Sequence, residues 1–206
     1  MSTDWYRNTT WNEAIERAFD DKLRRARSKA QYLRIQACTL ARSHPEVALR
    51  LLDRYFQLPQ DIDCAQAHVD RAEALLALGR TEEAIAAYEA ALAREQAFPN
   101  VLTQAYLHLP YLIATNKIGE RYEQALGLLK AHEARLTWPV EHFRWHAVCA
   151  LIAASQGERS TAKAEAEHAL EAARCRHSGF RYHAALGLVT EQYDGVIKEL
   201  ETYATA

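Results

Sequence analysis

His142 and His146 are the residues whose types and spacing come nearest to a chemical site in this chain. Side chains four residues apart share one face of a helix, so the pair forms one half of a two-histidine metal site. The HExxH pattern would need a glutamate where Phe143 stands, and no sequence feature fixes a third ligand. We therefore expect these histidines to pack between helices or line a groove, with no metal and no cofactor. A metal-dependent enzyme that uses His142 and His146 is kept as an alternative.

Other side chains that can ionise or act as nucleophiles form no recognised catalytic arrangement. They are Glu141, Cys149, His177 and His183. Catalysis requires an acid, a base or a nucleophile to converge in one pocket, and the sequence gives no sign of such convergence. We expect a protein that is not an enzyme and has no catalytic residue.

A short basic run follows an acidic pair near the start of the chain, in the stretch 20–29 (DDKLRRARSK). Acids and bases three or four residues apart on a helix pair weakly with one another, which favours a solvated helix face. The formal net charge of −2 gives no overall reason to bind nucleic acid or an acidic membrane surface. The alternative for this run is the binding of phosphate or of an acidic partner. Nucleic-acid binding, which we do not expect, would use Arg24, Arg25, Arg27, Lys29 and Arg34.

The elements that must position these side chains are helices. The chain has 206 residues, 49% of them hydrophobic, and alternating β-branched runs are scarce while alanine, leucine, glutamate and arginine abound. Thr81 is a predicted N-cap, followed by two carboxylates in the first helical turn. One apolar stripe of this helix carries Ala84, Ile85, Tyr88, Ala91 and Leu92.

Ala84 and Tyr88 form an A-x3-aromatic step, and Gly79-Arg80-Thr81 precedes it as a turn between two helices. In both features the stretch 65–96 resembles a tetratricopeptide repeat. One helix pair cannot enclose a core alone and needs stacked copies. The resemblance therefore implies an all-α fold, a right-handed α-solenoid of stacked antiparallel helix pairs with about ten or eleven helices.

Degenerate copies of this repeat extend over roughly residues 29–176. Their anchors are Ala48, Ala84, Ala125 and Ala162, spaced by 36, 41 and 37 residues. The family's period is about 34 residues, so longer helices or turns are expected here. The family's Leu-Gly pair would fall on Arg71-Ala72, a departure from the pattern.

The resemblance also implies a concave groove that binds a peptide or a protein segment. In family register its side chains would be Leu33, Arg34, Ala37, Val69, Glu73, Leu76, Tyr111, Arg144 and Leu151. The version of the groove that clamps a terminal carboxylate needs Lys and Asn at its central positions. Val69 and Glu73 stand at those positions, which argues against that clamp.

At the N-terminus, Thr10 and Glu13 predict a capping box that opens a helix at Trp11. Trp5, Tyr6 and Trp11 are expected to cover the open end of the repeat stack. An exposed contact surface for a partner is the alternative use of these aromatic residues.

Towards the C-terminus, Pro110 should bend a helix predicted over 101–116. Three further helices are expected over 161–176, 180–186 and about 194–203. Gly179 is expected to end the first of them in a left-handed conformation. The simplest organisation is one domain, with an N-terminal capping segment (1–28), four repeats (29–176) and C-terminal capping helices (177–206).

The four cysteines share no CxxC spacing, and each lies in a helical stretch as a small apolar residue would. The N-terminus has no apolar run typical of a signal peptide, and no stretch is apolar enough to cross a bilayer. We expect a cytoplasmic scaffold or adaptor that binds a protein or peptide, without nucleic acid or membrane. An immunity or antitoxin protein that occludes a toxin is the alternative.

Overall fold

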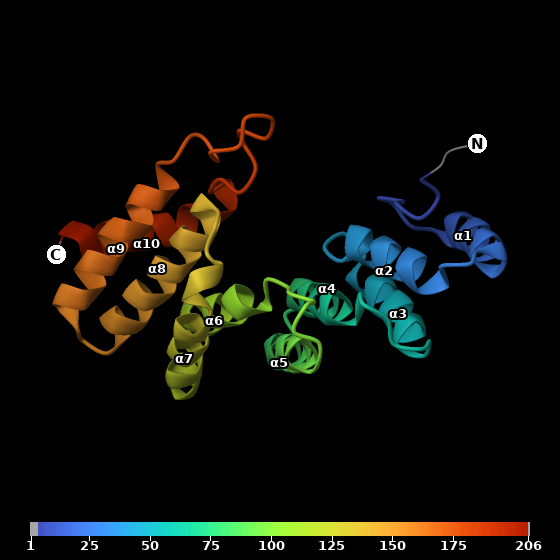
Figure 1. Cartoon of the computed structure of the whole chain (residues 1–206), viewed down its shortest axis with the longest axis horizontal. Helices are drawn as coiled ribbons and strands as arrows, with labels where there is room; N and C mark the ends of the chain where they lie inside the picture. The colour runs from blue at the N-terminus through green and yellow to red at the C-terminus, as the bar shows by residue number, and fades with distance from the viewer. Residues whose placement is uncertain (1–3, 206) are drawn as a thin grey trace. The chain divides into compact units, whose positions relative to one another are not determined.

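A computed structural model describes residues 4–205. Helix makes up 71% of it and no strand occurs among the described residues, in agreement with the all-α prediction. This part of the chain contains ten α-helices that pack in adjacent pairs (Figure 1). The contacts divide the chain into two compact units, Met1–Ala105 (unit 1) and Tyr106–Ala206 (unit 2).

Unit 1 is built from five helices. They are α1 (Glu13–Arg25), α2 (Lys29–Leu40), α3 (Pro45–Phe56), α4 (Cys64–Ala77) and α5 (Thr81–Ala97). The helices α2 and α3 form one packed pair, α4 and α5 form the next, and α3 contacts α4. Pro45 is the first residue of α3, a position where its missing N–H costs nothing.

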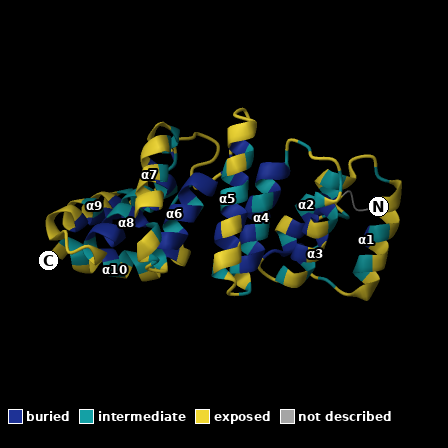
Figure 2. Cartoon of the chain, turned by 90° about the horizontal axis from the view of Figure 1, so that it is seen from below, coloured by how far each residue is buried: buried dark blue, intermediate teal, exposed yellow. Residues whose placement is uncertain are grey.

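The four alanines that the sequence predicts as repeat anchors are all buried. Ala48, Ala84 and Ala125 are fully enclosed, and Ala162 is 3% exposed. They lie on α3, α5, α7 and α9, and a small side chain at each position lets a neighbouring helix approach closely. Figure 2 shows buried residues concentrated where paired helices face each other.

The predicted starts of two helices in unit 1 are wrong. Asn12, not Thr10, caps α1, since its side chain accepts a hydrogen bond from the Ile15 N–H at 3.0 Å. Trp11 lies outside the helix, and its indole N–H donates to Glu16 instead. Thr81 is the first residue of α5 rather than its cap, and the cap position belongs to Arg80.

The N-terminal aromatic residues pack onto the first two helices. Trp5 contacts the rings of Tyr6, Phe19 and Tyr32, with centroid separations between 5.0 and 5.5 Å. Trp11 also contacts Phe19. These rings are half-buried or buried, so they pack together over α1 and α2.

A side-chain amide fixes the same N-terminal segment. Gln36 is fully buried on α2, and its Oε1 accepts hydrogen bonds from both the backbone N–H and the side-chain amide of Asn8. Gln36 Nε2 in turn donates to the Asn8 carbonyl at 2.8 Å. The buried amide is therefore satisfied only while the N-terminal segment is in place.

Unit 2 contains the other five helices. They are α6 (Ala105–Thr115), which begins at the unit boundary, α7 (Tyr122–His132), α8 (Pro139–Ser155), α9 (Arg159–Ala173) and α10 (Asp194–Thr205). Pro110 lies inside α6, and this helix begins at residue 105 rather than at the predicted residue 101. The helices α8 and α9 pack along their lengths, and α10 packs against both. Their shared core is Phe143, Ala147, Ala150, Ala166, Ala169, Leu170, Tyr193 and Leu200.

The predicted helix over 180–186 is wrong, because residues 174–190 form a loop. The helix α9 ends at Ala173, so Gly179, although its φ is +87°, does not terminate it. Ser178 organises the loop instead, since its Oγ donates to the His183 carbonyl and accepts from the Phe180 N–H. The last helix is confirmed as α10, directly after the short 3-10 turn Glu191–Tyr193. Among residues 4–205, no helix combines the length and apolar character needed to cross a bilayer.

Candidate functional site: a histidine-lined pocket in unit 2

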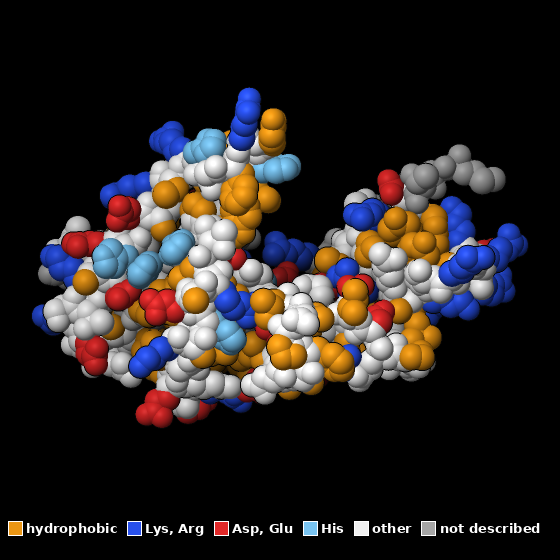
Figure 3. Space-filling model, viewed as in Figure 1, with side chains coloured by type: hydrophobic (Ala, Val, Ile, Leu, Met, Phe, Trp, Pro, Cys, Tyr) orange, Lys and Arg blue, Asp and Glu red, His pale blue; other side chains and the backbone are white. Residues whose placement is uncertain are grey.

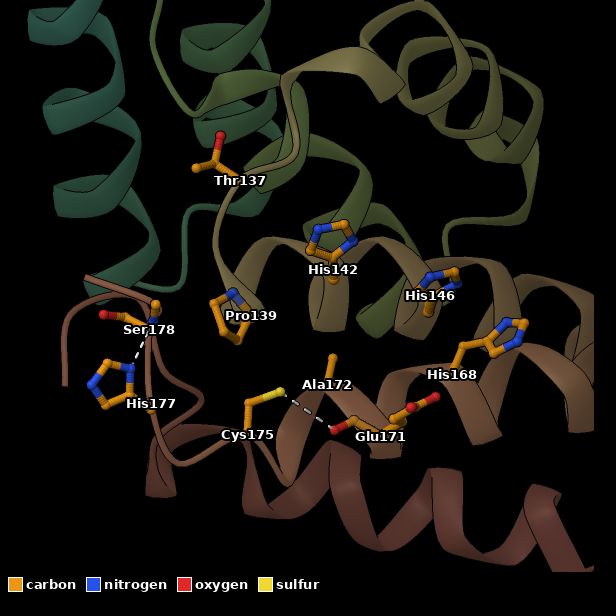
Figure 4. A pocket seen from close by; sticks show the side chains of 11 residues that line it. Thr137, Pro139, His142, His146, His168, Glu171, Ala172, Cys175, His177 and Ser178 are labelled. Carbon is orange, nitrogen blue, oxygen red and sulfur yellow. Dashed lines mark hydrogen bonds between the residues drawn. The ribbon is translucent and has the colours of Figure 1, made fainter. Parts of the chain in front are cut away.

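A cavity of about 530 Å³ opens beside α8, α9 and the loop that follows α9 (Figure 4). Its lining is rich in side chains that bind metals or transfer protons. They are His142 and His146 from α8, His168 and Glu171 from α9, and Cys175 and His177 from the loop. Figure 3 shows histidine side chains gathered on the surface over α8 and α9.

The start of α8 is held by a capping arrangement that explains the role of Glu141. This residue is buried, and its Oε2 accepts hydrogen bonds from the backbone N–H groups of Thr137 and Trp138 at 2.7 and 3.0 Å. Pro139 occupies the first helical turn. The Glu141 side chain therefore caps the N-terminus of α8. It does not line the pocket.

The loop after α9 is tied to the same end of α8. The Val140 N–H donates to the Gly187 carbonyl at 2.9 Å, and the rings of Trp138 and Phe180 lie 4.5 Å apart. Gly187 has a φ of +70°, and a Cβ at this position would lie 2.7 Å from Trp138. Only glycine fits this close approach, which holds the loop as one wall of the pocket.

His146 pairs with an acid on the neighbouring helix. Its Nδ1 lies 2.7 Å from Glu165 Oε2, and both side chains are about one-quarter exposed. The His146 ring also lies 5.0 Å from the ring of His168. Ligand atoms of these three residues all fall within 4.8 Å of one another.

Two thiols lie near this cluster. Burial, and then the Glu165 carboxylate, raises the pKa of the Cys149 thiol to about 12, so it is protonated at neutral pH. Cys175 is exposed on the pocket wall, where its Sγ approaches the Glu171 carbonyl at 3.9 Å. Neither arrangement resembles an activated nucleophile, because no base lies within the described hydrogen bonds of either thiol.

The structure brings together part of the predicted set of ionisable residues. His142, His146 and His177 line one pocket, whereas Glu141 caps α8 and His183 lies outside the lining. Glu165 and His168 were missed. The signal that could have found them is the Glu-x-x-His spacing on the second helix of the pair, which places both side chains on one face.

The residues predicted for the concave groove fall into two classes. Leu33, Ala37, Val69 and Leu151 are buried. Arg34, Glu73, Leu76, Tyr111 and Arg144 are half-buried. Side chains of the first class contribute to packing within their units, so only the second class offers surface to a partner.

Three half-buried members of that set already make contacts within their own unit. Arg34 on α2 pairs with the buried Asp70 on α4 at 3.2 Å. Arg144 Nε donates to the Tyr193 hydroxyl at 2.6 Å, and Tyr111 packs edge-on against the Tyr193 ring. These side chains therefore hold neighbouring elements together in addition to any binding role.

Comparison with known proteins gives no further guidance to the site. No family model matches the chain, and no curated protein and no solved structure matches it either.

Proposed function

We propose that this chain is a non-catalytic protein-binding module, built as a tetratricopeptide-like α-solenoid, that acts as a scaffold or adaptor in the cytoplasm. The observation that carries the proposal is a group of exposed apolar side chains in the loop of unit 2. Phe180, Tyr182 and Leu186 are 46, 81 and 54% exposed, all within seven residues of one another. We call these three side chains the apolar loop patch.

Exposed apolar side chains close together in one loop are typical of protein interaction sites. Aromatic residues and arginine supply most hot spots at such interfaces, and Arg181 lies 5.4 Å above the Tyr182 ring. The loop is anchored through Phe180 on Trp138, so binding would order few additional groups. An anchored loop with an exposed tyrosine therefore supports binding of a folded protein surface.

The paired helices and the buried alanine anchors support the repeat scaffold that presents this loop. The half-buried groove positions Glu73 and Leu76 on α4 supply a second proposed contact surface in unit 1. The four free cysteines are consistent with the proposed reducing compartment.

The test is capture of partners from the native cells by the full chain, followed by measurement of the affinity for each purified partner. Tyr182→Ala should weaken binding about 5- to 30-fold, since truncating an interface aromatic costs about 1–2 kcal/mol. Leu76→Ala tests the groove in the same assay. The matched control is Ile62→Ala in unit 1, which removes a side chain that is 77% exposed.

The outcomes separate the proposed roles. Several assembly components captured through Tyr182 would indicate a scaffold, and a single tight toxin partner would indicate an immunity protein. If Tyr182→Ala and Leu76→Ala bind every captured protein as well as Ile62→Ala does, the interaction surface proposed here is wrong.

A further inference from the structure

We propose that His146, Glu165 and His168 form a binding site for a divalent transition-metal ion, best suited to Zn²⁺, with a fourth position open to water. The proposal is independent of the partner-binding function, because it concerns the α8–α9 face rather than the apolar loop patch. We call these three residues the α8–α9 triad.

The donor set of the triad selects the class of ion. Two imidazoles and one carboxylate suit zinc and its first-row neighbours, whereas calcium and magnesium prefer sites made of oxygen ligands alone. Zinc sites with three protein ligands of this type leave a fourth position to water. A structural zinc site would use four protein ligands, and the triad offers three.

The backbone of two tightly packed helices fixes the spacing of the triad. His146 projects from α8, while Glu165 and His168 are one turn apart on α9, where side chains three residues apart share a face. Ligand atoms around a tetrahedral zinc ion lie about 3.4 Å apart, given metal–ligand bonds of about 2.1 Å. The ligand atoms of the triad already lie within 4.8 Å of one another.

Side-chain rotation is sufficient to close the remaining distance. His168 is exposed, and His146 and Glu165 are each about one-quarter exposed, so none is locked in a closely packed core. The 2.7 Å contact between His146 Nδ1 and Glu165 already places an imidazole nitrogen beside a carboxylate oxygen. A bound ion would replace the proton that these two atoms share.

The two histidines of the triad lie at the border of the cavity. His146 and His168 line the cavity (Figure 4), whereas Glu165 is absent from its lining. His142 on α8 and Glu171 on α9 line the same cavity, each about one turn away from a triad histidine. Water at the fourth position would therefore lie among additional polar groups.

Cys149 on α8 is not part of the triad. Its sulfur lies outside the group of ligand atoms that come within 4.8 Å of one another.

The test is calorimetric titration of Zn²⁺ into the full chain after treatment with a chelator, together with visible spectroscopy of the Co²⁺ form. We expect one ion per chain and the intense visible absorption of tetrahedral Co²⁺. Glu165→Gln keeps the shape of the side chain but removes its charge, and His168→Ala removes an exposed ligand, so both variants should fold. Each should lower Zn²⁺ affinity at least tenfold and abolish the tetrahedral spectrum.

His183→Ala is the matched control, because His183 is an exposed histidine of unit 2 outside the triad and the pocket lining. It should bind Zn²⁺ like the parent chain. The assignment is overturned if the parent shows no saturable binding, if Glu165→Gln and His168→Ala bind unchanged, or if His183→Ala weakens binding equally. Far-ultraviolet circular dichroism of each variant establishes that it is folded.

Discussion

Arg34 has a structural role that neither its type nor its place in the family register reveals. The family register assigns it to a binding groove, but its guanidinium pairs with Asp70 at 3.2 Å and lies 3.4 Å from Asp63. The Asp70 side chain is 4% exposed, and burial raises its pKa above the ordinary value even though Arg34 opposes the shift. The positive charge of Arg34 therefore stabilises the Asp70 carboxylate, which is buried between α2 and α4.

We predict that Arg34→Ala lowers the free energy of unfolding by about 3 kcal/mol at pH 7, because it leaves a buried carboxylate without its partner. The folded-state pKa of Asp70 should then rise further above its unfolded value. A carboxyl group with a raised folded-state pKa gains relative stability as pH falls, so the loss should be smaller at pH 5 than at pH 7.

Urea unfolding of the parent and of Arg34→Ala at the two pH values measures this effect. The double variant Arg34→Ala/Asp70→Asn should recover part of the lost stability at pH 7 and lose the difference between the pH values. An unfolding deficit that is the same at both pH values in Arg34→Ala would contradict the prediction.

Among the elements, the loop of residues 174–190 was the least accessible to sequence reasoning. The apolar residues from Phe180 to Leu186 have the spacing of a helix. The hydrogen bonds of Ser178 hold the backbone in a loop instead, and Gly187 packs this loop against Trp138. The helices themselves were predictable because their apolar stripes record which face is buried. The capping error at Thr10 arose because Asn12 offers the same chemistry two residues later.

The candidate site was half predictable for the same kind of reason. His142 and His146 are visible from their spacing on a single helix. The partner acid Glu165 lies 19 residues beyond His146 on another helix, so finding it requires the register of α8 against α9. That register is set by side-chain packing between α8 and α9, and this packing cannot be read from a single sequence.

Gly187→Ala tests how the loop is held. A Cβ there would meet Trp138 at 2.7 Å, and the residue has a left-handed φ of +70°. We predict a loss of about 2–4 kcal/mol in unfolding free energy, from backbone strain plus steric overlap, unless the loop detaches.

The matched control is Gly157→Ala, whose φ is +79° but whose added Cβ meets nothing within 4 Å. It should cost only about 1–2 kcal/mol, the cost of the left-handed conformation. Chemical unfolding gives both values, and Trp138 fluorescence reports loop detachment. Equal losses in the two variants, with unchanged fluorescence, would show that the contact with Trp138 is not restrictive.

At the scale of the whole molecule, the chain divides into two units with separate buried cores. A division in contacts favours independent folding of the two units, because each has a buried core of its own. We predict that fragments 1–104 and 101–206 each unfold cooperatively and retain helical circular dichroism. Denaturant titration of each fragment measures this, and a fragment without a cooperative transition would show that its unit needs the rest of the chain.

The contact between Asn8 and Gln36 has a consequence for what happens when a protease removes the N-terminal segment. Proteolytic loss of the first eight residues would remove Trp5 and Tyr6 from the rings of Phe19 and Tyr32, and would remove the hydrogen-bonding partner of the Gln36 amide. The trimmed end would then expose apolar and aromatic surface to water, and such a surface favours self-association. We therefore expect the N-terminal segment to limit aggregation of this protein.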